Sequence, residues 1–322
     1  MRNTAAKRPK LGLFYLDHVL QFFARSNFKK WPDRIEIVTY HWKGDEERFI
    51  KEVKKKGIDF LIGNVPATAY HTFLEIQKQL PHVSFIPSLE SQFCNRSKEN
   101  VTRFCWQNNL PTPETHIFSD HQEGIEYLKK CSYPRIIKRS YGPSNYGGYY
   151  VHKVESAKEA ESLVQEKRYS PVYVQECIEL EADIRVMLIG HQPVCAFWRR
   201  PRNGEWRTNT SQGGSMDYQD VPKSVLDLAI RSSQVSGAEY WGVDIAVSKG
   251  RYAILECATA FAAFPYIRDW IGGYLSWKLS NGEIPAPRIP LYNWEELGKI
   301  DPRLLRTMRD INFGYPMPNS GG

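Results

Sequence analysis

A chain of 322 residues is long enough to form two or three packed subdomains with a sizeable core. Its hydrophobic fraction of 42% and charged fraction of 25% are typical of a soluble globular protein, and no apolar stretch approaches the length of a membrane span. Because the first residues lack the apolar run of a secretory signal, we expect a cytoplasmic protein.

Short β-type runs alternate with helical patterns over roughly residues 8–92. The β-type runs lie at residues 11–16, 35–40, 59–64 and 83–88. Helical patterns occupy the intervals, for instance 46–56 and 69–80. This alternation predicts a small parallel-sheet α/β domain, and since the segment has no GxGxxG fingerprint, nothing marks it as a dinucleotide site.

The pattern changes after residue 97. We predict a helix over residues 98–109, which Pro111 stops, and after it an antiparallel α+β arrangement. Strand patterns lie at 135–138, 149–152, 172–176, 184–189 and 193–199, and helical patterns at 157–166 and 222–236. The residues from 286 to 322 are rich in Pro and Gly and predict an irregular tail.

Charge and cysteine content narrow the function further. The six cysteines form no CxxC pair, which favours reduced core thiols over disulfides or a zinc site. The formal net charge is +7, and one group of arginines lies close together: Arg199, Arg200, Arg202 and Arg207. These guanidinium groups need balancing by an acidic substrate or by nearby acids such as Glu205, Asp217 and Asp220. A nucleic-acid-binding protein has weaker support, because no module motif is present and aromatic residues do not alternate with the basic ones.

A predicted hairpin in residues 240–258 is the most informative segment. Two apolar runs flank a short turn, so one carboxylate on each strand, Asp244 and Glu256, can face the same side. Hard divalent ions such as Mg²⁺ take oxygen ligands and share nucleotide phosphates as co-ligands. The hairpin therefore predicts a phosphate-handling centre, the alternative being two unrelated acids in a surface hairpin.

A second feature lies about a hundred residues upstream. Lys138 ends a predicted strand and is followed by a loop rich in Gly, Ser and Asn at residues 141–149. An ammonium group and free backbone N–H groups in such a loop can surround phosphate oxygens, although an ordinary hairpin loop would have the same composition.

The order of these features resembles the ATP-grasp superfamily, and within it the branch of ribosomal-protein glutamate ligase (RimK-like) and related amino-acid ligases. The resemblance covers about residues 95–275 and is carried by Lys138, the glycine loop, the segment 174–178, Asp183 with Arg185, Arg207 with Asn209, Asp244 and Glu256. It implies an ATP-grasp fold, in which an N-terminal parallel-sheet domain precedes two α+β subdomains that enclose ATP. On this basis we divide the chain into an N-terminal domain at 1–95, a small lid subdomain at 96–172, a large subdomain at 173–285 and a tail at 286–322.

The resemblance also implies roles for individual residues. Lys98 and Lys138 would contact ATP phosphates, together with the loop residues Gly142, Ser144, Asn145 and Gly147. The hinge that reads adenine through its backbone would be Gln175, Glu176, Cys177 and Ile178, and Glu181 or Asp183 would take a ribose hydroxyl. Arg185, Arg207 and Asn209 would face the transferring groups, and Asp244 and Glu256 would hold Mg²⁺ or Mn²⁺.

The chemistry that the resemblance implies is ATP-dependent ligation. ATP phosphorylates a carboxylate, and an amine displaces phosphate from the acyl phosphate to form an amide. The partners would be small-molecule or peptide carboxylates and amines, and no membrane is expected among them. Whether the protein forms a homo-oligomer is left open. The alternatives are a catalytically degenerate ATP-binding regulatory module and, with weaker support, a nucleic-acid-binding protein.

One residue departs from the family pattern. The family has Glu-x-Asn at the end of its metal hairpin, whereas here Ala258 stands two residues after Glu256. Side chains alternate along a strand, so Ala258 shares the face of Glu256 but offers no metal ligand. A second metal ion would then be held by fewer protein oxygens. The segment after Ala258 also departs from the family, which leaves the acceptor side of the pocket open.

Overall fold

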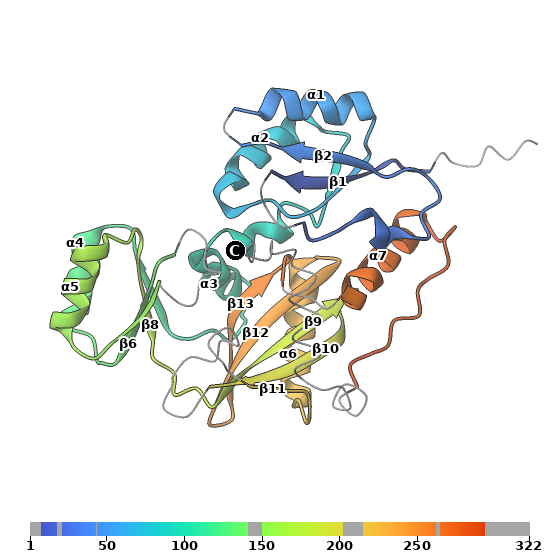
Figure 1. The fold of residues 1–322 in the computed structure, drawn as a ribbon. Helices are drawn as coiled ribbons and strands as arrows, with labels where there is room; N and C mark the ends of the chain where they lie inside the picture. The colour runs from blue at the N-terminus through green and yellow to red at the C-terminus, as the bar shows by residue number, and fades with distance from the viewer. Residues whose placement is uncertain are drawn as a thin grey trace, which may run out of the picture.

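The computed structural model describes residues 8–17, 21–42, 44–140, 150–201, 215–261 and 265–293. Its strands form three sheets, which Figure 1 shows as a blue N-terminal unit, a green lid and a yellow to orange central sheet. None of the helices in these residues is long and apolar enough to cross a membrane.

The N-terminal unit is a parallel sheet with the strand order β2-β1-β3-β4. Its strands are β1 (Leu11–Leu16), β2 (Glu36–Tyr40), β3 (Phe60–Ile62) and β4 (Ser84–Ile86). Its helices are η1 (Arg25–Phe28), α1 (Glu46–Lys56), η2 (Ala67–Ala69) and α2 (Tyr70–Gln79). Helix α1 has glutamates in its first turn, lysines in its last turn and Gly57 in the left-handed region after it, all of which favour the observed ends. The predicted parallel domain is confirmed.

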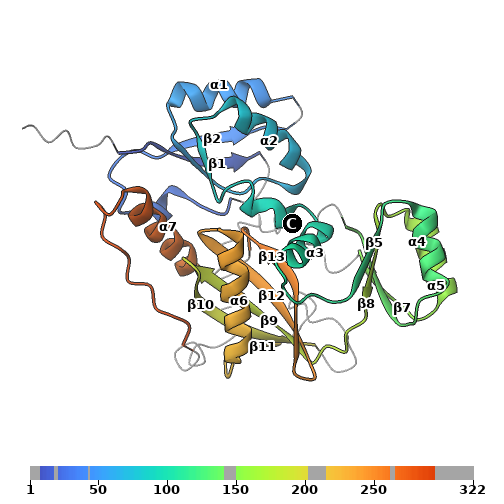
Figure 2. The same ribbon diagram turned by 180° about the vertical axis from the view of Figure 1, so that it is seen from behind.

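The lid is an antiparallel sheet of order β5-β8-β6-β7 with two helices packed on it (Figures 1 and 2). Its elements are β5 (Thr115–Phe118), α4 (His121–Leu128), β6 (Arg135–Lys138), β7 (Val151–Val154), α5 (Ala157–Lys167) and β8 (Val172–Glu176). Strand β8 pairs with both β5 and β6, so the predicted boundary at residue 172 is misplaced. The chain leaves the lid after Glu176, because strand pairing rather than local sequence decides to which unit β8 belongs.

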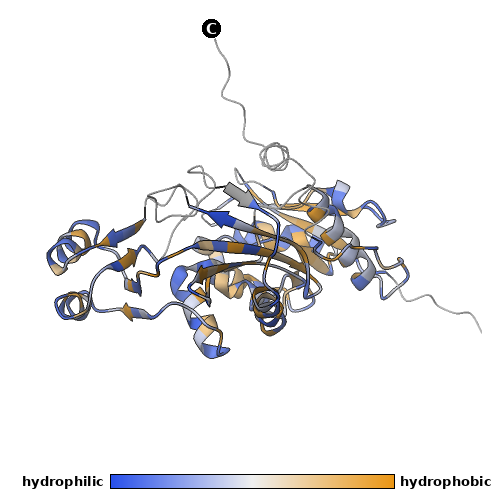
Figure 3. Ribbon diagram, turned by 90° about the horizontal axis from the view of Figure 1, so that it is seen from below, coloured by the Kyte–Doolittle hydropathy of each residue, from blue (hydrophilic) through white to orange (hydrophobic). Residues whose placement is uncertain are grey.

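The central sheet is antiparallel, with the order β11-β10-β9-β12-β13. Its strands are β9 (Ala182–Ile189), β10 (Gln192–Arg200), β11 (Ser215–Asp217), β12 (Tyr240–Ser248) and β13 (Arg251–Ala258). Helix α6 (Lys223–Ser236) lies on the face of this sheet that is turned toward the viewer in Figure 2. Helix α3 (Lys98–Gln107), preceded by η3 (Ser91–Arg96), packs on the same face. Hydrophobic residues run along these central strands (Figure 3).

The two faces of the central sheet differ because side chains alternate along each strand. Ile184, Val186 and Leu188 of β9 pack toward α6 and α3, whereas Met187 and Ile189 point to the opposite face. That opposite face meets helix α7 (Pro265–Leu279) and apolar residues of the N-terminal unit. By the same alternation, Asp183 and Arg185 lie on the face that meets the N-terminal unit.

The N-terminal unit docks tightly on α7. A Cβ atom built on Gly272 would lie 2.1 Å from the carbonyl oxygen of Asn27, so only glycine permits this approach of helix and η1. Gly272→Ala is therefore expected to lower the free energy of unfolding by about 1–3 kcal/mol, as overpacking usually does. The matched control is Gly273→Ala, where the new Cβ would lie 3.3 Å from Pro287, and it should stay within about 1 kcal/mol of the wild type. Equal urea midpoints for the two variants would argue against this close contact.

Candidate functional site

Five charged side chains gather on the face of the central sheet that also meets the N-terminal unit: Asp183, Arg185, Arg199, Asp244 and Glu256. Asp244 lies directly opposite Arg185 on β9 and directly opposite Glu256 on β13. Arg199 lies opposite Asp183. The predicted hairpin with one carboxylate on each strand is thereby confirmed.

Asp244 is held by two arginines. Its Oδ1 accepts from Arg185 Nε at 2.7 Å, and its Oδ2 accepts from Arg185 Nη2 and Arg199 Nη2, both at 2.7 Å. The Asp244 side chain is 7% exposed. Burial acts to raise the pKa of Asp244, but the two guanidinium groups outweigh it and keep that pKa well below its usual range. Asp244 is therefore a fixed negative charge at any ordinary pH.

Arg199 joins two acids. It donates to Asp183 as well as to Asp244, and its side chain is 11% exposed. Burial alone would lower the pKa of Arg199, but the two carboxylates raise it. Arg199 thus pairs with acids other than those expected, Asp183 and Asp244, whereas Arg200 lies 3.9 Å from the expected Asp217. Arg202, Arg207 and Glu205 lie outside the described residues.

The start of α3 brings Lys98 to the hairpin of β12 and β13. Ser97 caps this helix, its Oγ accepting from the backbone N–H of Asn100 at 3.0 Å, and α3 packs against β13. The ammonium of Lys98 donates to Glu256 Oε1. Burial acts to lower the pKa of Lys98, but the negative charge of Glu256 outweighs burial and raises that pKa. In return, the positive charge of Lys98 lowers the pKa of Glu256. The side chain of Glu256 stays half exposed and can therefore meet a ligand.

Lys138 lies at the end of β6, as predicted, and reaches toward the same place. Two residues after Lys138, the carbonyl oxygen of Ser140 accepts from the backbone N–H of Lys98 at 3.1 Å, and Ser140 Oγ accepts from the backbone N–H of Glu99 at 3.2 Å. These two bonds connect this end of the lid to the start of α3. Lys138 Nζ donates to Gln175 Oε1 at 2.6 Å. Burial and the nearby charge of Lys98 lower the pKa of Lys138 to about 7.

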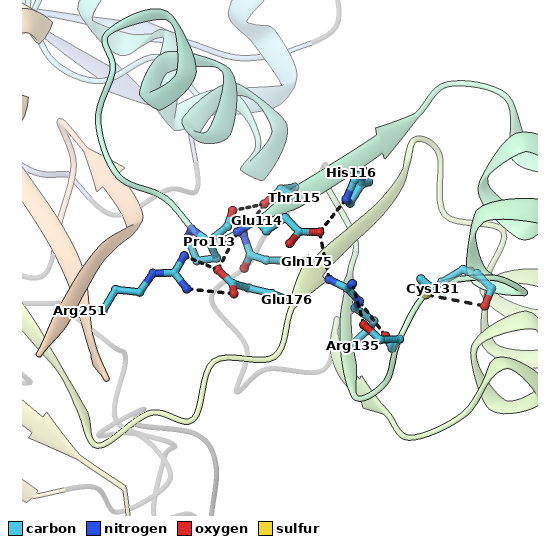
Figure 4. Close-up of polar contacts among 11 residues, drawn as sticks. Pro113, Glu114, Thr115, His116, Cys131, Arg135, Gln175, Glu176 and Arg251 are labelled. Atoms are coloured by element: carbon cyan, nitrogen blue, oxygen red, sulfur yellow. Dashed lines mark hydrogen bonds and ion pairs between the residues drawn. The ribbon is translucent and has the colours of Figure 1, made fainter. Parts of the chain in front are cut away.

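The other predicted carboxylates already have partners. Glu176 Oε1 accepts hydrogen bonds from Arg251 Nη2 at 2.7 Å and from the backbone N–H of Glu114 at 2.8 Å (Figure 4). Glu176 therefore links the segment that enters the lid at Glu114 to Arg251 of the central sheet. Glu181 accepts from the backbone N–H of Lys249 at 2.6 Å, in the turn between β12 and β13. Asp183 contacts Arg199. A ribose contact from Glu181 or Asp183 stays a prediction.

The remaining predicted residues either lie between the lid and the central sheet or are not described. Cys177 and Ile178 are partly buried in the segment that leads from the lid into β9. Outside the described residues lie the loop positions Gly142, Ser144, Asn145 and Gly147 and the catalytic candidates Arg207 and Asn209. The sequence interpretation missed Arg199 as a partner of Asp244. The signal available was strand alternation along β10, but it identifies a partner only once the sheet order is known.

The donor set suits a cation that shares its ligands with phosphates. Asp244 and Glu256 are oxygen donors on neighbouring strands, and Ala258 on the same face adds none. Within the described part of the chain, no group of three or more His, Cys, Asp or Glu side chains could hold a metal. The hairpin therefore fits an ion completed by nucleotide oxygens and water rather than a closed protein cage.

Comparisons with known proteins agree with this arrangement. Residues 95–263 match the family model described as the RimK-like ATP-grasp domain. The alpha-aminoadipate–LysW ligase LysX of Saccharolobus solfataricus is 30% identical over 47% of this chain and 56% of its own length. A probable alpha-L-glutamate ligase of Vibrio parahaemolyticus is 31% identical over 52% of this chain and 57% of its own. The chain thus spans little more than half the length of the curated relatives it matches.

The fold is shared with a solved structure as well. The RimK domain protein ATP-grasp from Sphaerobacter thermophilus superposes with a TM-score of 0.59 at 14% identity, covering 84% of this chain and 98% of that one. The predicted ATP-grasp fold, with its parallel sheet and two antiparallel sheets, is confirmed. Because the family model covers more than half of the residues, this chain belongs to the RimK-like ATP-grasp family.

Proposed function

We propose that this protein is an ATP-dependent carboxylate–amine ligase. A carboxylate oxygen attacks the terminal phosphorus of ATP and ADP leaves; an amine nitrogen then attacks the acyl carbon, phosphate leaves, and the nitrogen loses a proton. The observation that carries the proposal is the convergence of two lysines, Lys98 from α3 and Lys138 from the lid, on the carboxylate pair of the central sheet. This charge pattern suits polyphosphate and its cation, in a chain of the RimK-like family.

The described residues divide the work as follows. Lys98 and Lys138 offset phosphate charge, and Arg185 stands beside the carboxylate that would face the transferring phosphoryl group. Asp244 and Glu256 would hold Mg²⁺, or Mn²⁺, which neutralises charge on the terminal phosphates. Positioning and charge neutralisation suffice for this chemistry, so no nucleophilic side chain is required.

The remaining roles belong to the same proposal. The backbone of residues 175–178 would read adenine, and the loop containing Gly142, Ser144, Asn145 and Gly147 would cover the phosphates. Arg207 and Asn209 would act on the acyl group. The relatives are named for alpha-aminoadipate, LysW and glutamate. We therefore propose an amino acid or a peptide terminus as one substrate, and keep a cytoplasmic location as the expectation from the sequence.

A screen of carboxylates against amines tests the function. ADP release would be followed for each pair with ATP and Mg²⁺, and the amide product identified by mass spectrometry. The matched control is Glu256→Gln, which should release no ADP with the pair that is active in the wild type. ATP binding without ADP release from any pair would instead support the degenerate regulatory module, and salt-sensitive binding of DNA or RNA without ATP binding would support the nucleic-acid alternative.

The Mg²⁺ dependence of activity should show the effect of Ala258, the residue that departs from the family pattern. Ala258 lies opposite Gly242, where a Cβ would come 2.7 Å from the ring of Phe261, so this side of the hairpin is already packed. With no ligand from Ala258, activity should keep rising with Mg²⁺ above the concentration that saturates ATP binding. Ala258→Asn adds an amide oxygen beside Glu256 and should shift that rise to lower Mg²⁺. Activity lost at every Mg²⁺ concentration would contradict the weak-second-ion interpretation and indicate that alanine leaves room for a substrate.

A further inference from the structure

The side chain of Gln175 is buried and fully hydrogen-bonded. Gln175 lies in β8, where its backbone pairs with Thr115 on one side and Ile136 on the other, and the residue is 4% exposed. The side-chain amide takes no part in this strand pairing and points into the interior between the lid and α3. A buried amide in such a place is stable only if each of its polar atoms has a partner.

The partners of Gln175 fix which way its amide points. Oε1 accepts from Lys138 Nζ at 2.6 Å, and Nε2 donates to Thr115 Oγ1 at 2.9 Å and to Tyr173 OH at 3.0 Å. An ammonium has only protons to offer, so a flipped amide would set two donors against each other. All three contacts are satisfied in only one of the two orientations.

The neighbouring hydroxyl groups also donate away from Lys138, so the donor-to-acceptor direction set at Gln175 continues through them. Thr115 Oγ1 donates to the carbonyl of Pro113 at 2.8 Å, in the connection shown in Figure 4. Thr102 Oγ1 donates to the carbonyl of Lys98 at 3.1 Å, so Tyr173 is left to donate to Thr102 at 2.8 Å. Each hydroxyl has one proton and one assigned acceptor. A continuous chain of hydrogen bonds thus runs from the ammonium of Lys138 to the backbone of Lys98.

The two lysines are held by different chemistry. Lys98 contacts a carboxylate, Glu256, whereas no salt bridge joins Lys138 to an acid among the described residues. A neutral amide directs a flexible ammonium without cancelling its charge, and a lysine fixed in advance loses less side-chain entropy when phosphate arrives. Gln175 is thus suited to orient Lys138 without adding a negative charge that would offset its ammonium.

We propose that Gln175 is a positioning residue, whose amide aims Lys138 at the nucleotide phosphates and links it through Tyr173 and Thr102 to the start of α3. This inference rests on the proposed ATP-dependent function. It differs from the role that the resemblance gives to Gln175, because the side chain acts here on phosphate binding, whereas the hinge role uses only the backbone. It predicts that changes in this side chain affect phosphate recognition and leave recognition of the nucleoside intact.

The test compares ATP with adenosine on the same variants. Gln175→Met keeps the length of the side chain but removes the acceptor for Lys138, so ATP affinity should fall about tenfold, the loss expected of one charge-assisted contact, while adenosine affinity stays at the wild-type value. Gln175→Glu places a carboxylate on Lys138, cancels its charge and should lower ATP affinity at least as much. Tyr173→Phe removes the link to Thr102 and one acceptor of Gln175 Nε2, but it leaves the contact between Gln175 Oε1 and Lys138 and should have a smaller effect. ATP binding is measured by calorimetry and adenosine binding by competition.

Controls separate this role from a general loss of structure. Gln165→Met, on the exposed surface of α5, should leave both affinities unchanged. Circular dichroism at the assay temperature selects conditions under which each variant is folded. An equal loss of ATP and adenosine affinity in Gln175→Met would mean that the amide supports the adenine pocket or the lid fold, and unchanged ATP affinity would mean that Lys138 needs no such support; either result overturns the proposal. A wild-type protein that does not bind ATP would refute the proposed function itself.

Discussion

Replacing Asp244 by asparagine is expected to abolish ADP release and also to destabilise the protein by about 3–5 kcal/mol, the range for breaking a buried ion pair. The catalytic loss follows from removing a charge that would hold Mg²⁺. The stability loss follows from the two guanidinium groups, Arg185 and Arg199, which share this one buried carboxylate. With asparagine in place, Arg199 keeps its contact with Asp183, whereas Arg185 loses the carboxylate that it contacts. Activity assays and urea denaturation measure the two effects separately.

Glu256→Gln is the matched control for Asp244→Asn. Glu256 would serve the same ion, so activity should be lost in the same way, but its side chain is 45% exposed and pairs only with Lys98. Lys98 is 16% exposed, but this pair has one half-exposed partner, whereas Asp244→Asn leaves two buried guanidinium groups, so the free energy of unfolding should fall less in Glu256→Gln than in Asp244→Asn. If both variants keep near-normal activity at low Mg²⁺, the hairpin is not the metal site. If Asp244→Asn is as stable as Glu256→Gln, the buried arginine pair does not depend on Asp244.

The pH dependence of stability gives an independent check on Asp244. Its pKa lies well below the usual range in the folded protein, whereas an aspartate in the unfolded chain titrates at about 3.9. The unfolded chain therefore binds the proton first, and the contribution of Asp244 to stability is present above this pH and is lost as pH falls toward the native pKa. Acid unfolding curves of the wild type should be steeper below about pH 4 than those of Asp244→Asn.

Strand alternation is the part of the site that sequence could predict. The pattern in residues 240–258 was enough to expect a hairpin with Asp244 and Glu256 on one face, and the structure pairs these two residues directly. Lys138 at a strand end and the parallel N-terminal sheet followed from equally local patterns. These features depend on periodicity and turns, which a single segment contains.

Long-range pairing is the part that sequence could not predict. Whether β8 belongs to the lid depends on its partners β5 and β6, and both lie more than 30 residues away in the chain. Arg199 contacts Asp244 because β9 lies between β10 and β12, an order that no local pattern encodes. The side-chain role of Gln175 likewise depends on Thr115, Tyr173 and Thr102, which come from three different elements.

Lys138→Met is expected to weaken ATP binding by about ten- to a hundredfold, since a charge-assisted contact contributes roughly 1.5–3 kcal/mol. Methionine keeps most of the side-chain volume, so the lid core around β6 should be preserved. The ammonium is buried near Lys98, has Gln175 as its hydrogen-bond acceptor, and carries no salt bridge among the described residues. Its charge is therefore available for phosphate. Calorimetry with ATP measures the loss, and wild-type affinity in the variant would remove Lys138 from the site.

The depressed pKa of Lys138 gives this prediction a second, more specific signature. With a pKa of about 7 in the free protein, the ammonium is partly deprotonated above neutrality, and phosphate should restore its charge. ATP affinity should thus fall by up to tenfold per pH unit above about 7 in the wild type, with proton uptake on binding, and should fall much less in Lys138→Met. Comparing the two proteins over the same range cancels the titration of the nucleotide itself.

The same titration acts on the stability of the fold, with a sign that can be checked without nucleotide. Between pH 7 and the ordinary lysine value of 10.5, the unfolded chain binds more protons at Lys138 than the folded protein does. The free energy of unfolding should therefore rise with pH across this window in the wild type, and the rise should be smaller in Lys138→Met. Parallel profiles of the two proteins would mean that Lys138 titrates normally, and the pH dependence of ATP affinity would then have to come from another group.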